Sequence, residues 1–245
     1  MAEYLIFRLY GPMAAWGDIA VGETRPSYPH PSKSAVLGLI AAALGIKRSQ
    51  EDEHRRLSDG YGMAILVTSP GTSAPDYHTA QVPPSSAGRN RRIFPTRRDE
   101  ILALRRDELK TILSRRDYRM DALYIAALWE KKGAPYDFKT IANKLSAPHY
   151  TLYLGRKSCP LALPLEPQVV DAPNLRGAFK KGKFTDSEEL RWLQTKGKPA
   201  LYWEEGAKIG IEPQHIFERR DIPLSRKRWQ FDVRREYQAS YQEEG

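Results

Sequence analysis

The stretch Ser32-Lys-Ser-Ala-Val-Leu-Gly-Leu-Ile-Ala-Ala-Ala-Leu-Gly45 predicts one short, buried helix. Ser32 is a common N-cap residue and Gly45 a common residue just past a helix end, so we expect the helix to run to Leu44. Apolar side chains fall on almost every side of it, and such a helix is stable only when other elements cover it. Gly38 costs about 1 kcal/mol of helix propensity, which favours close packing against a neighbouring element at that position.

Strand patterns lie on both sides of this helix and predict the fold class. Four short runs have the alternation or the apolar content of strands, and one later run has a helical pattern. We expect strands at residues 4–10, 62–68, 122–128 and 150–154, and a second helix at residues 138–145. The order β-α-β-insert-β-α-β predicts an α+β, ferredoxin-like β-α-β-β-α-β domain.

Two regions fall outside that pattern. Residues 71–119 form an insert between the second and third strands, and it is too long to be a plain connection. Residues 166–245 combine Pro-rich turns with short strand-like pieces. We therefore expect a main domain over residues 1–165 and a smaller, irregular β-rich region over residues 166–245.

The composition favours a polyanion as partner. The chain has 245 residues, 41% of them hydrophobic, with 39 Lys and Arg against 30 Asp and Glu, a net charge of +9 and a pI near 9.5. Such an excess is typical of proteins that bind nucleic acid or an anionic surface. No apolar run approaches the roughly 18 residues of a membrane span, so we expect no membrane contact. Because Cys159 is the single cysteine and the N-terminus lacks the pattern of a secretion signal, we expect a cytoplasmic protein without an internal disulfide.

Few residues have the pattern of a catalytic or metal site. The five histidines are scattered without metal-ligand spacing, and no P-loop, dinucleotide-binding or nucleophile-elbow motif is present. We therefore expect no metal and no cofactor. Only His78, in Asp76-Tyr-His-Thr79, has other acid–base groups beside it. It is the one candidate catalytic residue, with a purely structural role as the open alternative.

The stretch Tyr150-Thr-Leu-Tyr-Leu-Gly-Arg-Lys-Ser-Cys-Pro160 predicts a binding site for a phosphodiester chain. Tyr153 lies on one face of the expected strand, and the glycine that follows lets the backbone approach a ligand closely. Arg156, Lys157 and Ser158 then supply the hydrogen-bond donors that phosphates need. The alternative interpretation is a solvated strand end.

A first basic stretch lies inside the insert. Residues 89–119 carry eleven Lys or Arg against five Asp or Glu. The arginines come as doublets, whose guanidinium forks suit phosphates: Arg91-Arg92, Arg97-Arg98, Arg105-Arg106 and Arg115-Arg116. We expect Arg97 and Arg98 at an exposed binding tip, and Arg105-Arg106 on a helix face where neighbouring acids pair with them.

A second basic stretch, residues 219–235, holds seven cations and two acids interleaved with Trp229 and Phe231. Cations beside aromatic faces are typical of proteins that hold single-stranded nucleic acid. Arg226, Lys227 and Arg228 are therefore candidates for backbone contacts. The alternative is an edge strand guarded by charge, with both rings packed inward.

The start of the first helix is a candidate second anion site. Backbone N–H groups at a helix N-terminus and the helix dipole both favour an anion. Arg25, Lys33 and Ser34 lie just before this start or at it, so we expect them to hold a phosphate there.

Several stretches together resemble the Cas-five family of repeat-associated (RAMP) CRISPR proteins, in the CasD branch of the type I-E surveillance complex Cascade. The matching stretches are residues 4–17, Arg25-Pro26, residues 34–46, Asp76-Tyr-His-Thr79 and Pro148-His-Tyr-Thr-Leu-Tyr-Leu-Gly-Arg-Lys-Ser-Cys-Pro-Leu161. They stand in the order that the family has and cover residues 1–165.

The resemblance implies an RRM-like, ferredoxin-type RAMP fold in which the insert is the family's thumb. It implies a non-catalytic RNA-binding subunit that caps the 5′ handle of the CRISPR RNA in antiviral defence. The implied partners are the adjacent backbone subunit, the large subunit and, through the complex, target DNA. A different subunit cuts the precursor in this subtype, but in a sister subtype the corresponding subunit is a metal-independent endoribonuclease. That activity is the alternative, with His78 as its candidate base.

Overall fold

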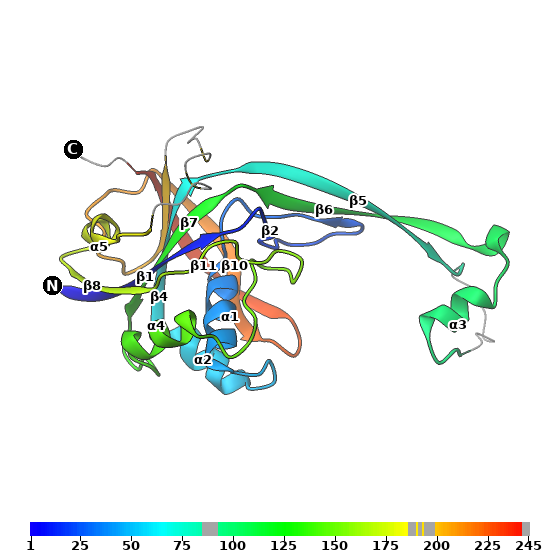
Figure 1. The fold of residues 1–245 in the computed structure, drawn as a ribbon, viewed down its shortest axis with the longest axis horizontal. Helices are drawn as coiled ribbons and strands as arrows, with labels where there is room; N and C mark the ends of the chain where they lie inside the picture. The colour runs from blue at the N-terminus through cyan, green and yellow to red at the C-terminus, as the bar shows by residue number, and fades with distance from the viewer. Residues whose placement is uncertain (85–92, 186–189, 191–192, 194–198, 242–245) are drawn as a thin grey trace.

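The computed structural model describes residues 1–84, 93–185, 190, 193 and 199–241, and it has an α+β body from which a long two-stranded arm extends (Figure 1). The strands of the body are β1 (Ala2–Tyr10), β4 (Tyr61–Ser69), β7 (Leu123–Glu130), β8 (Gln168–Ala172), β9 (Ala200–Glu204), β10 (His215–Ser225) and β11 (Gln230–Ser240). They form one sheet in the order β10-β11-β9-β4-β7-β1-β8, and every neighbouring pair is antiparallel.

Helices cover both faces of this sheet. Over one face lie α1 (Lys33–Leu44), α2 (Glu51–Gly60) and α4 (Phe138–Ser146), and over the other lies α5 (Leu175–Lys181) (Figure 1). Because side chains alternate along a strand, Leu5, Phe7 and Leu9 of β1 enter the core under α1 and α4. Tyr4 and Ile6 point the other way, into the core under α5. None of the helices in the described residues has the length and apolar content needed to cross a membrane.

The first helix forms where the sequence predicts it. The side chain of Ser32 accepts a hydrogen bond from the N–H of Ala35 at 3.1 Å, and Gly45 ends the helix with a φ of 80°. Gly38 has the expected close neighbour, since a Cβ at this position would lie 3.5 Å from Nη2 of Arg226. The strands predicted at residues 4–10, 62–68 and 122–128 and the helix predicted at residues 138–145 are also confirmed, with small shifts at their ends.

The strand predicted at residues 150–154 is wrong. This segment is irregular, with a single β-bridge between Tyr153 and Pro160. β1 pairs with β7 on one side, and the strand that pairs with it on the other side is β8. Leu152 and Leu154 point into the core, while Tyr150, Thr151 and Tyr153 are exposed. A loop packed on the core can thus alternate as a half-buried strand does, and periodicity alone does not separate the two.

The strands beyond residue 165 extend the sheet of the body. β9, β10 and β11 continue it past β4, and β8 forms the opposite edge beside β1. In the described residues beyond 165, these four strands share one sheet with those of residues 1–165.

The arm consists of β5 (Thr72–Val82) and β6 (Lys110–Met120), which together match the insert expected at residues 71–119 to within one residue. The strands pair along all 11 residues of each. At about 3.4 Å per residue, the ribbon spans on the order of 35 Å. β2 (Met13–Ala14) and β3 (Thr24–Arg25) also pair with β6, and α3 (Arg97–Leu102) lies at the far end of the arm (Figure 1). β5 is exposed along nearly its whole length.

Candidate nucleic-acid interface

A groove of about 550 Å³ lies between α1, the segment 150–155 and the turn 226–229 that joins β10 to β11. Three partly exposed rings border it: Tyr150 (40% exposed), Tyr153 (37%) and Trp229 (58%). Its lining also includes four basic residues: Lys47, Arg48, His54 and Arg226. No Asp or Glu is found among the described residues that line it. The groove is therefore suited to an anion that also carries a flat, apolar surface.

Arg226 lies against α1 in this groove with its charge uncompensated. Its Nη2 donates to the carbonyl of Ser34 at 3.0 Å, and its Nε is buried without a hydrogen-bond partner. Burial lowers the pKa of this guanidinium, and the nearby charge of Arg48 lowers it further. No carboxylate pairs with Arg226 in the part of the chain that the structure describes. A half-buried guanidinium without a counter-charge is a favourable place for a phosphate.

Trp229 points out of the fold beside Arg226. Cζ of Arg48 lies 4.2 Å from the centroid of the Trp229 ring, and the ring of Phe231 stacks at 6.0 Å. Arg48 also donates from Nη2 to the carbonyl of Arg226 at 3.0 Å, which ties the turn to the residues after α1. The alternative interpretation of the second basic stretch is correct in part: β10 is an edge strand of the sheet, but Trp229 is exposed instead of packed inward, and Phe231 is half-buried.

The predicted cluster Arg156, Lys157 and Ser158 forms a turn beside β6. Gly155 begins this turn with a φ of 85°, and a Cβ there would lie 1.9 Å from a backbone oxygen, so only glycine fits. Cζ of Arg156 lies 4.9 Å from the centroid of the Tyr118 ring, and its Nη1 is buried without a hydrogen-bond partner. Lys157 and Ser158 are exposed. Because Gly155 lines the groove, this turn continues the basic surface from the groove toward the arm.

The second anion site predicted at the start of α1 is not open. Lys33 is 2% exposed, and its Nζ pairs with a carboxylate oxygen of Glu204 at 2.9 Å. Oδ2 of Asp221 accepts the backbone N–H of Lys33 at 2.7 Å. The helix N-terminus does favour an anion, but a carboxylate of the protein itself occupies the place.

The two other residues predicted at that site lie apart from Lys33. Arg25 is exposed on β3, where it pairs in register with Arg116 of β6 and donates from Nη1 to the carbonyl of Gly22 at 2.7 Å. The hydroxyl of Ser34 bonds to the neighbouring Ser32 hydroxyl at 3.0 Å, and its carbonyl accepts from Arg226. Arg25 thus lies beside β6. Ser34 contacts Arg226 through its carbonyl but does not line the groove.

A buried ion network that the sequence did not indicate lies in the middle of the β10–β11 hairpin. Arg219 and Arg234 pair with Asp221 and Glu236 at distances from 2.5 to 3.5 Å. His30 is fully buried, with Nδ1 accepting from Nη1 of Arg219 at 2.8 Å and Nε2 3.2 Å from Glu236. Burial alone would raise the pKa of Glu236, but its contacts with His30, Arg219 and Arg234 hold that pKa well below its ordinary value.

The far end of the arm carries the other predicted cations. Arg97 and Arg98 begin α3 and are exposed, and Arg97 pairs with Glu100. Arg105 precedes a short 3-10 helix (Arg106–Glu108) and pairs with the carboxylates of Asp107 at 3.6 Å and Glu108 at 3.7 Å. The expected pairing with neighbouring acids is thus confirmed for Arg105. The doublet Arg91-Arg92 lies outside the described residues.

His78 lies on β5, paired with Asp76 through Nε2 and Oδ2 at 2.5 Å. In the register of the arm, Ser114 lies opposite His78 and Arg116 opposite Asp76. Directly opposed residues share one face of a ribbon, so these four side chains lie on the same face. Both members of the His–Asp pair are about half exposed, at 48% and 49%.

Comparisons with known proteins cover most of the chain. A family model described as CRISPR-associated protein (Cas_Cas5) matches residues 4–237. The CRISPR system Cascade subunit CasD of Escherichia coli (strain K12) is 35% identical over 173 residues, which is 67% of this chain and 70% of that protein. Two solved structures share the fold. A chain of a CRISPR RNA-guided surveillance complex has a TM-score of 0.65 at 24% identity, covering 97% of this chain and 89% of that one, and a Cas protein has a TM-score of 0.57 at 21% identity, covering 97% and 94%.

Proposed function

The chain belongs to the Cas5 family of CRISPR-associated proteins, and we propose that it is a non-catalytic RNA-binding subunit of a Cascade surveillance complex. In this role it holds the 5′ handle of the CRISPR RNA in antiviral defence. It contacts the adjacent backbone subunit and the large subunit, meets target DNA only through the complex, and works in the cytoplasm. The similarity to CasD and to a chain of a surveillance complex supports this assignment.

The observation that carries the proposal is the acid-free groove beside Arg226. Single-stranded RNA is held by cations at its phosphates and by aromatic faces at its unstacked bases. The groove offers both, and Arg156 and Lys157 follow directly from its edge. With Arg25 further along β6, they give a basic path from the groove to the arm.

We also propose that β1-α1-β4-β7-α4-β8 is a ferredoxin-like unit and that the β5–β6 arm is the thumb. The β-α-β-β-α-β order of these elements and their antiparallel pairing support the first assignment, with α2 as an addition. The position of the arm between β4 and β7 supports the second. Arg97 and Arg98 then lie at the far end of the thumb. The division at residue 165 stays a prediction.

The proposal is tested by incubating the purified chain with end-labelled CRISPR repeat RNA in EDTA. We expect saturable binding that prefers the handle-derived sequence and RNA that stays intact on a denaturing gel. A matched RNA of scrambled sequence and heparin serve as competitors. Discrete cleavage at the handle boundary, or equal competition by heparin and repeat RNA, would contradict the proposal.

Replacing Arg156 and Lys157 together by Ala is expected to weaken this binding and to flatten its salt dependence. Each lost phosphate contact lowers the slope of log K against log salt by about 0.7 for a single strand, so two contacts lower it by about 1.4. The matched control replaces Lys132 and Lys208, two exposed lysines outside the groove, by Ala. Unchanged affinity of the Arg156/Lys157 variant across a salt series would remove both residues from the interface.

A metal-independent endoribonuclease is the second candidate function, and the His78–Asp76 pair favours it. A carboxylate that orients an imidazole supports its use as a general base on a 2′-hydroxyl. Arg116, opposite Asp76, is placed to stabilise the negative charge that develops. On this hypothesis His78→Ala stops cleavage in EDTA without loss of RNA binding. Cleavage at full rate by His78→Ala would discard the assignment.

A further inference from the structure

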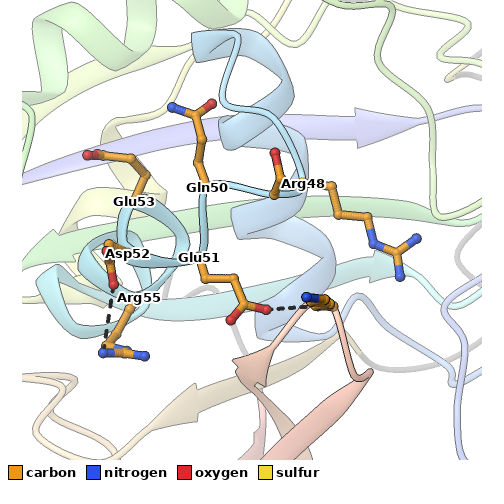
Figure 2. Close-up of a pocket in the computed structure, with 8 residues that line it drawn as sticks. Arg48, Gln50, Glu51, Asp52, Glu53 and Arg55 are labelled. Atoms are coloured by element: carbon orange, nitrogen blue, oxygen red, sulfur yellow. Dashed lines mark hydrogen bonds and ion pairs between the residues drawn. The ribbon is translucent and has the colours of Figure 1, made fainter.

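The turn 226–229 stands between two pockets of different charge. On one side is the acid-free groove, and on the other is an open pocket at the start of α2, lined by Glu51, Asp52 and Glu53 together with basic residues (Figure 2). Figure 2 shows Glu51 reaching from α2 toward the turn, whereas Asp52 is directed to Arg55, 3.9 Å away. The two neighbouring carboxylates therefore have different surroundings.

Glu51 anchors the turn through two hydrogen bonds. Its Oε1 accepts the backbone N–H of Lys227 at 2.9 Å and the hydroxyl of Ser225 at 2.7 Å. These bonds hold the pKa of Glu51 below its ordinary value, with the Lys227 N–H as the main cause. Three successive cations in the turn repel one another. The acceptor on Glu51 therefore adds to the hydrogen bond within the turn itself, from the N–H of Arg228 to the hydroxyl oxygen of Ser225 at 3.1 Å.

Two further hydrogen bonds hold the turn from the groove side. Arg226 donates to the carbonyl of Ser34, and Arg48 donates to the carbonyl of Arg226. Nη1 of Arg226 lies 4.0 Å from where a Cβ on Gly38 would be, and Gly38 and Arg226 both line the groove. The hydrogen bonds with Glu51, Ser34 and Arg48 thus fix the turn on both sides. They hold the guanidinium of Arg226 in the lining of the groove, to which Tyr153 also belongs.

We propose that the groove binds one unpaired nucleotide of RNA, with its phosphate on Arg226 and Arg48 and its base on the ring of Tyr153, and that Glu51 positions the turn for this contact. The inference rests on the proposed function and names the ligand unit of that interface. A volume of about 550 Å³ lies inside the range of roughly 300–1,000 Å³ that small-molecule sites occupy. Stacking on an aromatic ring accepts any base, so this contact reads the presence of a nucleotide and not its identity. The proposed preference of the rest of the interface for the handle sequence fixes which nucleotide of a handle-derived RNA enters the groove.

The nucleotide contact is tested with the full chain and short single-stranded RNAs that carry 2-aminopurine at one position at a time. Stacking quenches the fluorescence of this base, so we expect one position to be quenched by the wild-type protein. Tyr153→Ala removes that quenching and weakens binding by about fivefold or more, the loss typical of one stacked base. Gly38→Leu places a longer side chain against Arg226 and is expected to have the same two effects. If both variants quench and bind as the wild type does, the groove is not the site.

The positioning role of Glu51 predicts that loss of this carboxylate lowers the affinity for RNA, which is opposite to the usual effect of removing an acid. Removing a carboxylate from a protein that binds a polyanion ordinarily leaves its affinity unchanged or raises it. We expect that behaviour from Asp52→Ala, the matched loss of an acid from the same helical turn. Glu51→Ala is instead expected to weaken RNA binding by about fivefold, through loss of the two hydrogen bonds that hold the turn. Glu51→Gln keeps an acceptor oxygen at the same place and is expected to restore binding.

Thermal unfolding of every variant separates loss of the site from loss of the fold. Equal affinities of Glu51→Ala and Asp52→Ala, with unfolding temperatures like that of the wild type, would overturn the positioning role. If Tyr153→Ala and Gly38→Leu both bind RNA as tightly as the wild type, the groove assignment is wrong, but the proposed function still holds. A wild-type chain that binds no RNA would overturn the proposed function itself.

Discussion

One hairpin contains two kinds of arginine. Arg219 and Arg234 lie on the inward face of β10 and β11, where they pair with Asp221 and Glu236. Arg226 lies at the turn, and no carboxylate pairs with it among the described residues. Within one basic stretch, the arginines in the middle of the hairpin thus stabilise the fold, whereas the arginine at its tip has charge available for an anion.

The pKa shifts of Arg234 and Arg226 have opposite signs for one physical reason. Burial alone would lower the pKa of Arg234, but Asp221 and Glu236 overcome this effect and raise it. Burial also lowers the pKa of Arg226, and no carboxylate opposes the effect, so the charge of Arg48 adds to it. A desolvated cation without a counter-charge gains most from an external anion. The absence of a carboxylate partner, and not the residue type, therefore indicates which arginine binds the ligand.

The largest expected effect is that of Arg234→Ala, a loss of about 3–5 kcal/mol in the free energy of unfolding. The change leaves Asp221 and Glu236 short of a partner in a buried site. Urea denaturation followed by circular dichroism measures the loss. The matched change at the tip, Arg226→Ala, removes a cation without a carboxylate partner and is expected to cost less than about 1 kcal/mol while weakening RNA binding. Equal losses of stability in the two variants would break the comparison.

The next effect is a fall in stability on mild acidification, caused by His30. Burial lowers the pKa of His30 in the folded state, so below about pH 6.5 the unfolded chain binds more protons than the folded one. Stability is therefore full above about pH 6.5 and declines as the pH falls below it. Urea denaturation between about pH 7.5 and pH 5.5 measures this slope.

The variant His30→Gln sharpens the pH experiment. Its amide can accept from Arg219 and donate to Glu236, as the neutral imidazole does, but it does not titrate. We expect a smaller loss of stability between neutral and mildly acidic pH, with a remaining slope of the same sign from His54, whose pKa burial also lowers. A slope identical to that of the wild type would show that His30 is not the titrating group.

The smallest expected effect is that of Gly38→Ala. Gly38 lies on α1, and the change affects the hairpin only at its tip, where Arg226 packs against this helix. A Cβ at Gly38 lies at ordinary contact distance from Arg226, 3.5 Å from Nη2, so the helix gains up to about 1 kcal/mol of propensity without a clash. The added methyl group also narrows the groove. We expect a higher unfolding temperature together with slightly weaker RNA binding, measured by calorimetry and by titration with labelled RNA. Tighter binding in this variant would contradict the groove geometry.

Local patterns predicted those elements whose causes are local. Ser32 and Gly45 bound α1 as expected, and the alternation of β1 sends its side chains into the two cores. The same kind of pattern failed at residues 150–154, because a loop that packs alternate leucines on the core mimics a strand. The helix α2 was missed because Leu57 is its one large buried apolar side chain, which leaves no apolar periodicity to detect.

For the interface, the sequence by itself determined the family resemblance, the positive charge and the residue types, since motifs and composition are properties of the chain. Only the tertiary structure decided which cations are available to an anion. Lys33, predicted to bind, pairs with Glu204, which is 171 residues away, while Arg226 keeps its charge unpaired beside Tyr153. Burial and pairing depend on contacts between residues far apart in the chain, and these contacts exist only once the sheet has brought the first helix and the last hairpin together.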